Sequence, residues 1–111
     1  MEQTQSTVSL REGRRGPSLR LEGSIGPALA GELHAAAMRA AAAGSDVSID
    51  WRRARHLSAA ALQVLLALSA DLAARGFRLQ GGAPHASAVA ALEMTGLDAV
   101  IGRPGGRRKN A

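Results

Sequence analysis

The fold of this chain is decided by residues 19–50, which run LRLEGSIGPALAGELHAAAMRAAAAGSDVSID. Polar and apolar residues alternate over Ser18–Glu22, which is typical of a strand with one buried face. Apolar residues recur at helical spacing from about Pro27 to Ala43, and Gly44 is a typical helix end. Alternation returns over Asp46–Trp51, which predicts a second strand at the centre of a sheet.

A second long helix is predicted to begin at Ser58, whose hydroxyl can accept a hydrogen bond from a free amide of the first turn. The apolar stripe of this helix comprises Ala61, Val64, Leu65, Leu68 and Leu72. The opposite face comprises Gln63, Ala67, Ala70, Asp71 and Ala74. Gly76 is expected to end the helix.

Shorter elements follow this helix. Phe77–Gln80 is predicted as a strand, and the pair Gly81-Gly82 as a loop. A third helix is predicted from about Pro84 to Thr95, closed by Gly96.

Strands that alternate with helices across short connections predict an α/β fold, here a small mixed β-sheet with helices packed mainly on one face. A chain of 111 residues has room for a single domain. We expect an N-terminal strand or flexible start in residues 1–16, with the strand at Thr7–Leu10. The domain itself is expected to span 17–101, and a basic disordered tail 102–111.

The net charge of +5 and the pI near 11.5 suggest nucleic-acid binding only if the charge lies on the folded part. Between residues 17 and 101, however, seven arginines are balanced by seven acidic residues. The excess lies at the ends, chiefly at Arg103, Arg107, Arg108 and Lys109. Trp51 and Phe77 are the only aromatic residues, so there is no platform for stacking bases. We expect no specific nucleic-acid binding, with contact through the tail as a weaker alternative.

Composition also bears on metals, catalysis and membranes. The chain has no cysteine, and His34, His56 and His85 lack the spacing of metal ligands. Ser58 has neither a Gly-x-Ser-x-Gly turn nor a placed base, which favours a capping role over a nucleophilic one. No apolar run approaches the roughly eighteen residues of a membrane span, and no apolar leader opens the chain. We expect a cytoplasmic, non-enzymatic protein with no cofactor and no membrane insertion.

Three features around the second strand have more than one interpretation. Trp51 suits either the core or an exposed contact, and burial is favoured. Asp46 and Asp50 share one face of the strand, but nothing indicates a shared proton or a metal, so solvated strand ends are favoured. No Gly-Lys-Ser/Thr follows Gly81-Gly82, which favours a simple turn over a phosphate-binding loop.

Several strings in this order resemble the STAS domain, the family of bacterial anti-sigma-factor antagonists and related regulatory modules. The resemblance runs from about Ser18 to Ile101. It comprises LRLEGSIGPALAGELHAAAMRAAAAG, then VSID, SAAALQVLLAL, ARGFRL and ALEMTGLDAVI. The last string is similar to the family's leucine, glycine-leucine ending, carried here by Leu92, Gly96 and Leu97.

The resemblance implies a signalling motif at the start of the second helix. In the family this motif is Asp-Ser-Ser/Thr-Gly-Leu, and alignment on Leu62 places it over Ser-Ala-Ala-Ala-Leu at 58–62. The position that an anti-sigma kinase phosphorylates is Ala59, which has no hydroxyl, and Ser58 lies one residue early. Because the dephosphorylated form binds in the family, we expect a permanently binding-competent domain.

The resemblance therefore implies a regulatory protein-binding module of bacterial signal transduction and transcription regulation. Its expected partner is an anti-sigma factor or a histidine-kinase-like protein such as a chemotaxis kinase. The alternative is the cytosolic STAS accessory subunit of a phospholipid-trafficking ABC transporter, and a homodimer is compatible with either role. The predicted partner-binding residues are Gly23, Ser24, His56, Leu57, Ser58, Ala59, Ala60 and Gln63.

Three arginines, Arg52, Arg53 and Arg55, precede the second helix. They suit a solvated loop or a basic patch beside the alanine-lined helix start. A patch would have an acidic partner surface as its complement.

Overall fold

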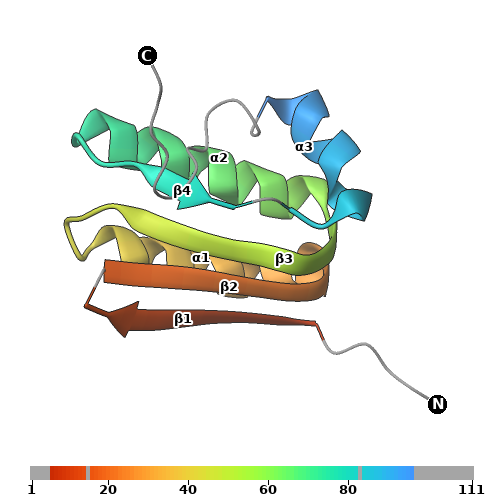
Figure 1. Ribbon diagram of the computed structural model, residues 1–111, viewed down its shortest axis with the longest axis horizontal. Helices are drawn as coiled ribbons and strands as arrows, with labels where there is room; N and C mark the ends of the chain where they lie inside the picture. Colours follow the sequence, from red (N-terminus) through yellow and green to blue (C-terminus); the bar gives the residue numbers. More distant parts are fainter. Residues whose placement is uncertain (1–5, 15, 83, 97–111) are drawn as a thin grey trace.

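A computed structural model describes residues 6–14, 16–82 and 84–96, and Figure 1 shows its layers. The elements in chain order are β1 (Thr7–Gly13), β2 (Gly16–Ile25), α1 (Pro27–Ala41), β3 (Val47–Leu57), α2 (Ala59–Ala74), β4 (Leu79–Gly81), the short 3₁₀ helix η1 (Ala86–Ala88) and α3 (Val89–Thr95). The four strands form one sheet in the order β1-β2-β3-β4, and α1 and α2 lie side by side behind it (Figure 1). β1 is antiparallel to β2, and the other pairs are parallel. The predicted mixed sheet with helices mainly on one face is confirmed.

The core lies between the sheet and this helix pair. Leu19 and Leu21 of β2 are fully buried, as their alternation predicts, and they face Leu33 of α1 within one apolar cluster. On α2 the buried residues are Ala61, Leu62, Leu65, Leu68 and Leu72. Val64, predicted for the buried stripe, is only half-buried. The predicted outer face of α2 is exposed throughout.

The central strand is longer than the sequence predicts. β3 continues for six residues beyond Trp51, through Arg52 to Leu57. Its pairing with β2 has two register irregularities, which break the alternation of buried and exposed residues. From Trp51 to Leu57, two exposed residues separate each buried residue from the next. Of the two interpretations of the three arginines, the solvated loop is wrong, because this segment is paired strand.

The last strand is displaced from its predicted position. The amide of Phe77 donates to the carbonyl of Leu72 at 2.8 Å, in the turn where Gly76 adopts a φ of +86°. Phe77 therefore belongs to the turn that follows α2, and β4 starts only at Leu79. Gly81, predicted as loop, is the last residue of β4 and pairs with Ile49.

Trp51 is buried, as predicted, and together with Ile49 it accounts for the glycine at position 81. A Cβ at Gly81 would lie 2.7 Å from Ile49 Cγ2 and 3.1 Å from Trp51 Cζ2. Ile49 and the indole fill the space that a side chain would need, so β4 ends in a residue without one.

The third helix is shorter than predicted. His85 caps η1, and α3 begins only at Val89, although it ends at Thr95 before Gly96 as expected. Leu97 and the basic tail 102–111 lie outside the described residues. Within the described part of the chain, no helix has the length and apolarity needed to cross a bilayer.

Candidate functional site

The carboxyl ends of β2 and β3 meet the start of α2 at one edge of the sheet (Figure 1). Ser24 pairs with His56, and Ile25 pairs with Leu57. The amide of Ser58 donates to the carbonyl of Ile25 at 2.9 Å. Parallel pairing therefore brings together residues that the sequence places more than thirty positions apart.

Ser58 is the N-cap of α2, as predicted. Its Oγ accepts a hydrogen bond from the amide of Ala61 at 3.2 Å, which satisfies one of the free donors of the first turn. Its hydroxyl is thus engaged in holding the helix start. Ala59, the next residue, is exposed.

The predicted partner-binding residues fall into two groups. Ser24, His56, Ala59 and Gln63 are exposed, and Ser58 and Ala60 are half-buried. Gly23 and Leu57 are buried, and Leu57 is only 3% exposed within the core. Gly23 and Leu57 therefore lie beneath the surface that the other six residues form.

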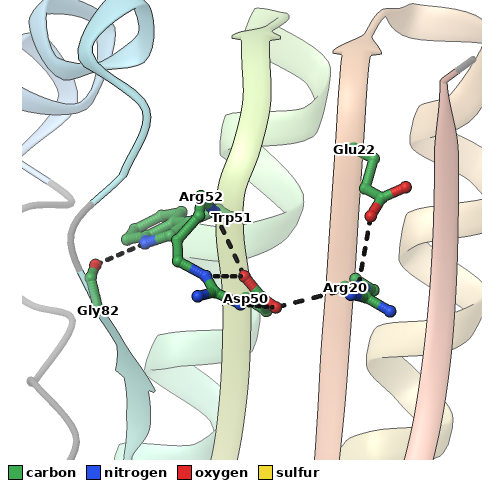
Figure 2. A network of polar contacts seen from close by, with 6 residues as sticks. All are labelled: Arg20, Glu22, Asp50, Trp51, Arg52 and Gly82. Carbon is green, nitrogen blue, oxygen red and sulfur yellow. Dashed lines mark hydrogen bonds and ion pairs between the residues drawn. The ribbon is translucent and has the colours of Figure 1, made fainter.

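A polar network lies in the middle of β2 and β3 (Figure 2). The guanidinium of Arg52 contacts both carboxylate oxygens of Asp50 at 3.1 Å. Arg20 Nε lies 3.9 Å from Asp50 and 3.4 Å from Glu22. Asp50 was expected at a solvated strand end, but it lies within β3 with its side chain 30% exposed.

This network shifts two pKa values. The hydrogen bond from Arg52 lowers the pKa of Asp50 below its usual value, against a smaller opposing effect of burial. The same hydrogen bond raises the pKa of Arg52. The guanidinium of Arg52 is therefore already paired with Asp50, and in this respect Arg52 differs from Arg53 and Arg55.

Two residues that sequence reasoning missed hold β3 in place next to the site. The hydroxyl of Ser87 donates to the carbonyl of Arg55 at 2.7 Å, and His85 Nδ1 accepts the amide of Ser87 at 3.1 Å. Ser87 lies thirty-two positions from Arg55 in the chain, so no local pattern signals the contact.

A histidine and a serine lie close together beside β3. His85 Nδ1 lies 2.8 Å from Ser87 Oγ, but it accepts the amide of Ser87 in the cap of η1, and the Ser87 hydroxyl donates to the backbone carbonyl of Arg55 in β3. In the described ranges, no three side chains of the His, Cys, Asp or Glu type are grouped to hold a metal ion.

Comparisons with known proteins agree with this fold. The sequence matches, over residues 8–102, the family described as "Mlab, STAS domain". Among curated proteins, none matches the sequence. The fold is similar to the anti-sigma factor antagonist SpoIIAA in its unphosphorylated form, with a TM-score of 0.66 and 16% identity over 85% of this chain and 97% of that one. It is also similar to the Bacillus cell fate determinant SpoIIAA in the phosphorylated form, with a TM-score of 0.65 and 16% identity over 86% and 88% of the two chains.

Proposed function

This chain belongs to the STAS domain family, and we propose that it is a non-enzymatic regulatory module that docks a protein partner through the start of α2. The observation that carries the proposal is the surface formed by Ser24, His56, Ala59 and Gln63. These side chains are exposed, come from three elements, and rest on a backbone tied together between Ser58 and Ile25.

Small side chains at the helix start suit close approach by a partner. Ala59 and Ala60 present no long side chain that would have to be ordered on binding, so little rotamer entropy is lost there. Gln63 adds an amide one turn further along the same exposed face. The surface is preorganised by the cap and by the strand pairing, which favours rigid docking.

Loss of the phosphorylation position makes this module constitutively competent for binding. Ala59 occupies the place of the phosphorylated serine and cannot accept a phosphoryl group. The Ser58 hydroxyl is engaged in the cap of α2. We infer that the domain is regulated by the availability of its partner and not by modification at this position.

The leading partner is an anti-sigma factor or another histidine-kinase-like signalling protein, including a chemotaxis kinase. Similarity of the fold to an anti-sigma factor antagonist supports this class. The second candidate is the STAS accessory subunit of a phospholipid-trafficking ABC transporter. The description of the matched family, which names Mlab, favours it.

Capture of the partner from the native host tests the docking surface and separates the two roles. Tagged full-length chain is used as bait, bound proteins are identified by mass spectrometry, and the affinity of the purified partner is then measured by titration. An anti-sigma factor or kinase would support signalling, whereas the ATPase of a transporter would support the second candidate.

The variant Gln63→Glu is expected to weaken binding of that partner by about tenfold or more, because a carboxylate that replaces the amide must be desolvated in the contact. The matched control is Ala70→Glu, which places the same side chain on an exposed position of α2 two turns away. Equal affinity of Gln63→Glu and wild type would show that the partner binds elsewhere.

A further inference from the structure

We propose that the partner meets the start of α2 with a cluster of acidic side chains, and that Arg53 and Arg55 are the residues that recognise it. This inference rests on the proposed function and names the chemistry of the partner surface. Its basis is the presence of two exposed guanidinium groups without a counter-charge beside an uncharged helix start.

The neighbouring acids are already occupied. Asp50 is held by Arg52 through two contacts of 3.1 Å, and Glu22 lies 3.4 Å from Arg20. Glu22 is the register partner of Arg53, yet no ion pair joins them. Within the described ranges, Arg53 and Arg55 therefore have no acidic partner.

The backbone that carries these two arginines is fixed. The register shifts of β3 expose both of them while Ala54 between them is fully buried. The hydroxyl of Ser87 holds the carbonyl of Arg55 at 2.7 Å. Their positions relative to His56 and the cap of α2 are thus set before a partner arrives, which lowers the entropy cost of recognition.

The helix start leaves this positive charge uncompensated. From Ala59 to Ala70, α2 carries no charged residue, and its first turn has no acid. The positive end of the helix dipole points to the same edge and adds to the field of the two arginines. An approaching acidic surface would be attracted to the start of α2 and oriented by this positive field.

An acidic protein surface fits this patch better than a nucleic acid or a membrane. Two arginines flanked by alanine, histidine and glutamine provide a short cluster of charge, whereas nucleic-acid binding needs many phosphate contacts or aromatic stacking. The exposed residues around it, Ser24, Ala59 and Gln63, include no large apolar side chain for insertion into a bilayer.

The test uses the full chain with isotope-labelled backbone amides and an oligoglutamate peptide as the probe. At low ionic strength, amide shifts are expected at residues 53–60. The double variant Arg53→Glu, Arg55→Glu should weaken the apparent affinity by about tenfold or more, and the neutral pair Arg53→Gln, Arg55→Gln by less. The matched control is Arg39→Glu, Arg78→Glu, which makes the same charge reversal at two other exposed arginines and should retain nearly all the affinity.

Oligothymidine and vesicles of anionic lipid are tested in parallel. Weaker effects of both at residues 53–60 support the proposal. It is overturned if oligoglutamate shifts other residues, if the control pair loses as much affinity, or if DNA or vesicles act more strongly at this edge. A partner that is lost with Gln63→Glu but unaffected by reversal of Arg53 and Arg55 would leave the proposed function intact and contradict this inference alone.

Discussion

Trp51 Nε1 donates a hydrogen bond to the carbonyl oxygen of Gly82 at 2.7 Å (Figure 2). This contact joins the middle of β3 to the residue that follows β4. The same indole lies over Gly81, where it and Ile49 occupy the space of a side chain. Trp51 therefore holds the end of β4. Further along the chain, in η1, the hydroxyl of Ser87 donates to the backbone carbonyl of Arg55.

The close contact at Gly81 predicts that Gly81→Ala is destabilising by about 1–3 kcal/mol, because Ile49 and Trp51 must shift to admit a methyl group. The neighbouring change Gly82→Ala meets nothing within 4 Å and should cost within about 0.5 kcal/mol. Urea denaturation of both variants measures the difference. Similar losses at the two positions would show that the contact with Ile49 and Trp51 does not determine the choice of glycine.

The cap of α2 predicts that Ser58→Ala lowers the free energy of unfolding by about 1 kcal/mol, because the amide of Ala61 loses its acceptor. Ser58→Asp is the matched control, since aspartate also caps helices and its negative charge is favourable at this end of the dipole. Thermal melting should show a fall of about 4–8 °C for alanine and none for aspartate. A stable Ser58→Ala would mean that water replaces the hydroxyl.

Local patterns were sufficient for most of the fold. The alternation around Leu19, the spacing of Leu65 and Leu72, and the capping residue Ser58 each depend on neighbours within a few positions, and the structure confirms them. The position of Ala59 at the exposed start of α2 follows from the same local reasoning.

The predictions that were wrong concern segments whose structure depends on contacts with distant residues of the chain. Beyond Trp51 the strand continues because β2 pairs with it through irregular register, which the polar run Arg52–His56 does not reveal. Leu57 is predicted among the partner-binding residues, but in the structure it pairs with Ile25 and lies in the core. The anchoring of Arg55 depends on a residue thirty-two positions away.

The pair of Asp50 and Arg52 predicts a loss of stability in acid. The pKa of Asp50 is lower in the folded protein than its usual 3.8, so its contribution is present above that value and is lost as the pH falls through the folded pKa. Because the carboxylate is 30% exposed, the effect should stay below about 1 kcal/mol. Asp50→Asn should be less stable than wild type near neutral pH, and the difference should vanish in acid.

Arg52→Gln provides the control for this assignment. Without the guanidinium, the pKa of the Asp50 carboxyl should rise toward its usual value, which NMR titration of that carboxyl measures directly. A titration unchanged by Arg52→Gln would assign the shift to another group.

The engaged hydroxyl of Ser58 and the missing one at position 59 predict that this site is not phosphorylated in the cell. Mass spectrometry of the protein purified from its own host should find peptides containing Ser58 without phosphate. Substantial phosphate on Ser58 would contradict the inference of constitutive binding.

The most direct test of the docking surface is the affinity of Ala59→Asp for the captured partner, compared with Ala59→Asn. The two side chains match in size, but the carboxylate must be desolvated in the contact, so Ala59→Asp should weaken binding by about 1–3 kcal/mol relative to Ala59→Asn. Its stability should be retained, because a negative charge in the first helical turn is favourable, and melting is measured separately to show this. Loss of affinity in a folded Ala59→Asp variant is the predicted result, and wild-type affinity of that variant would contradict docking at the start of α2.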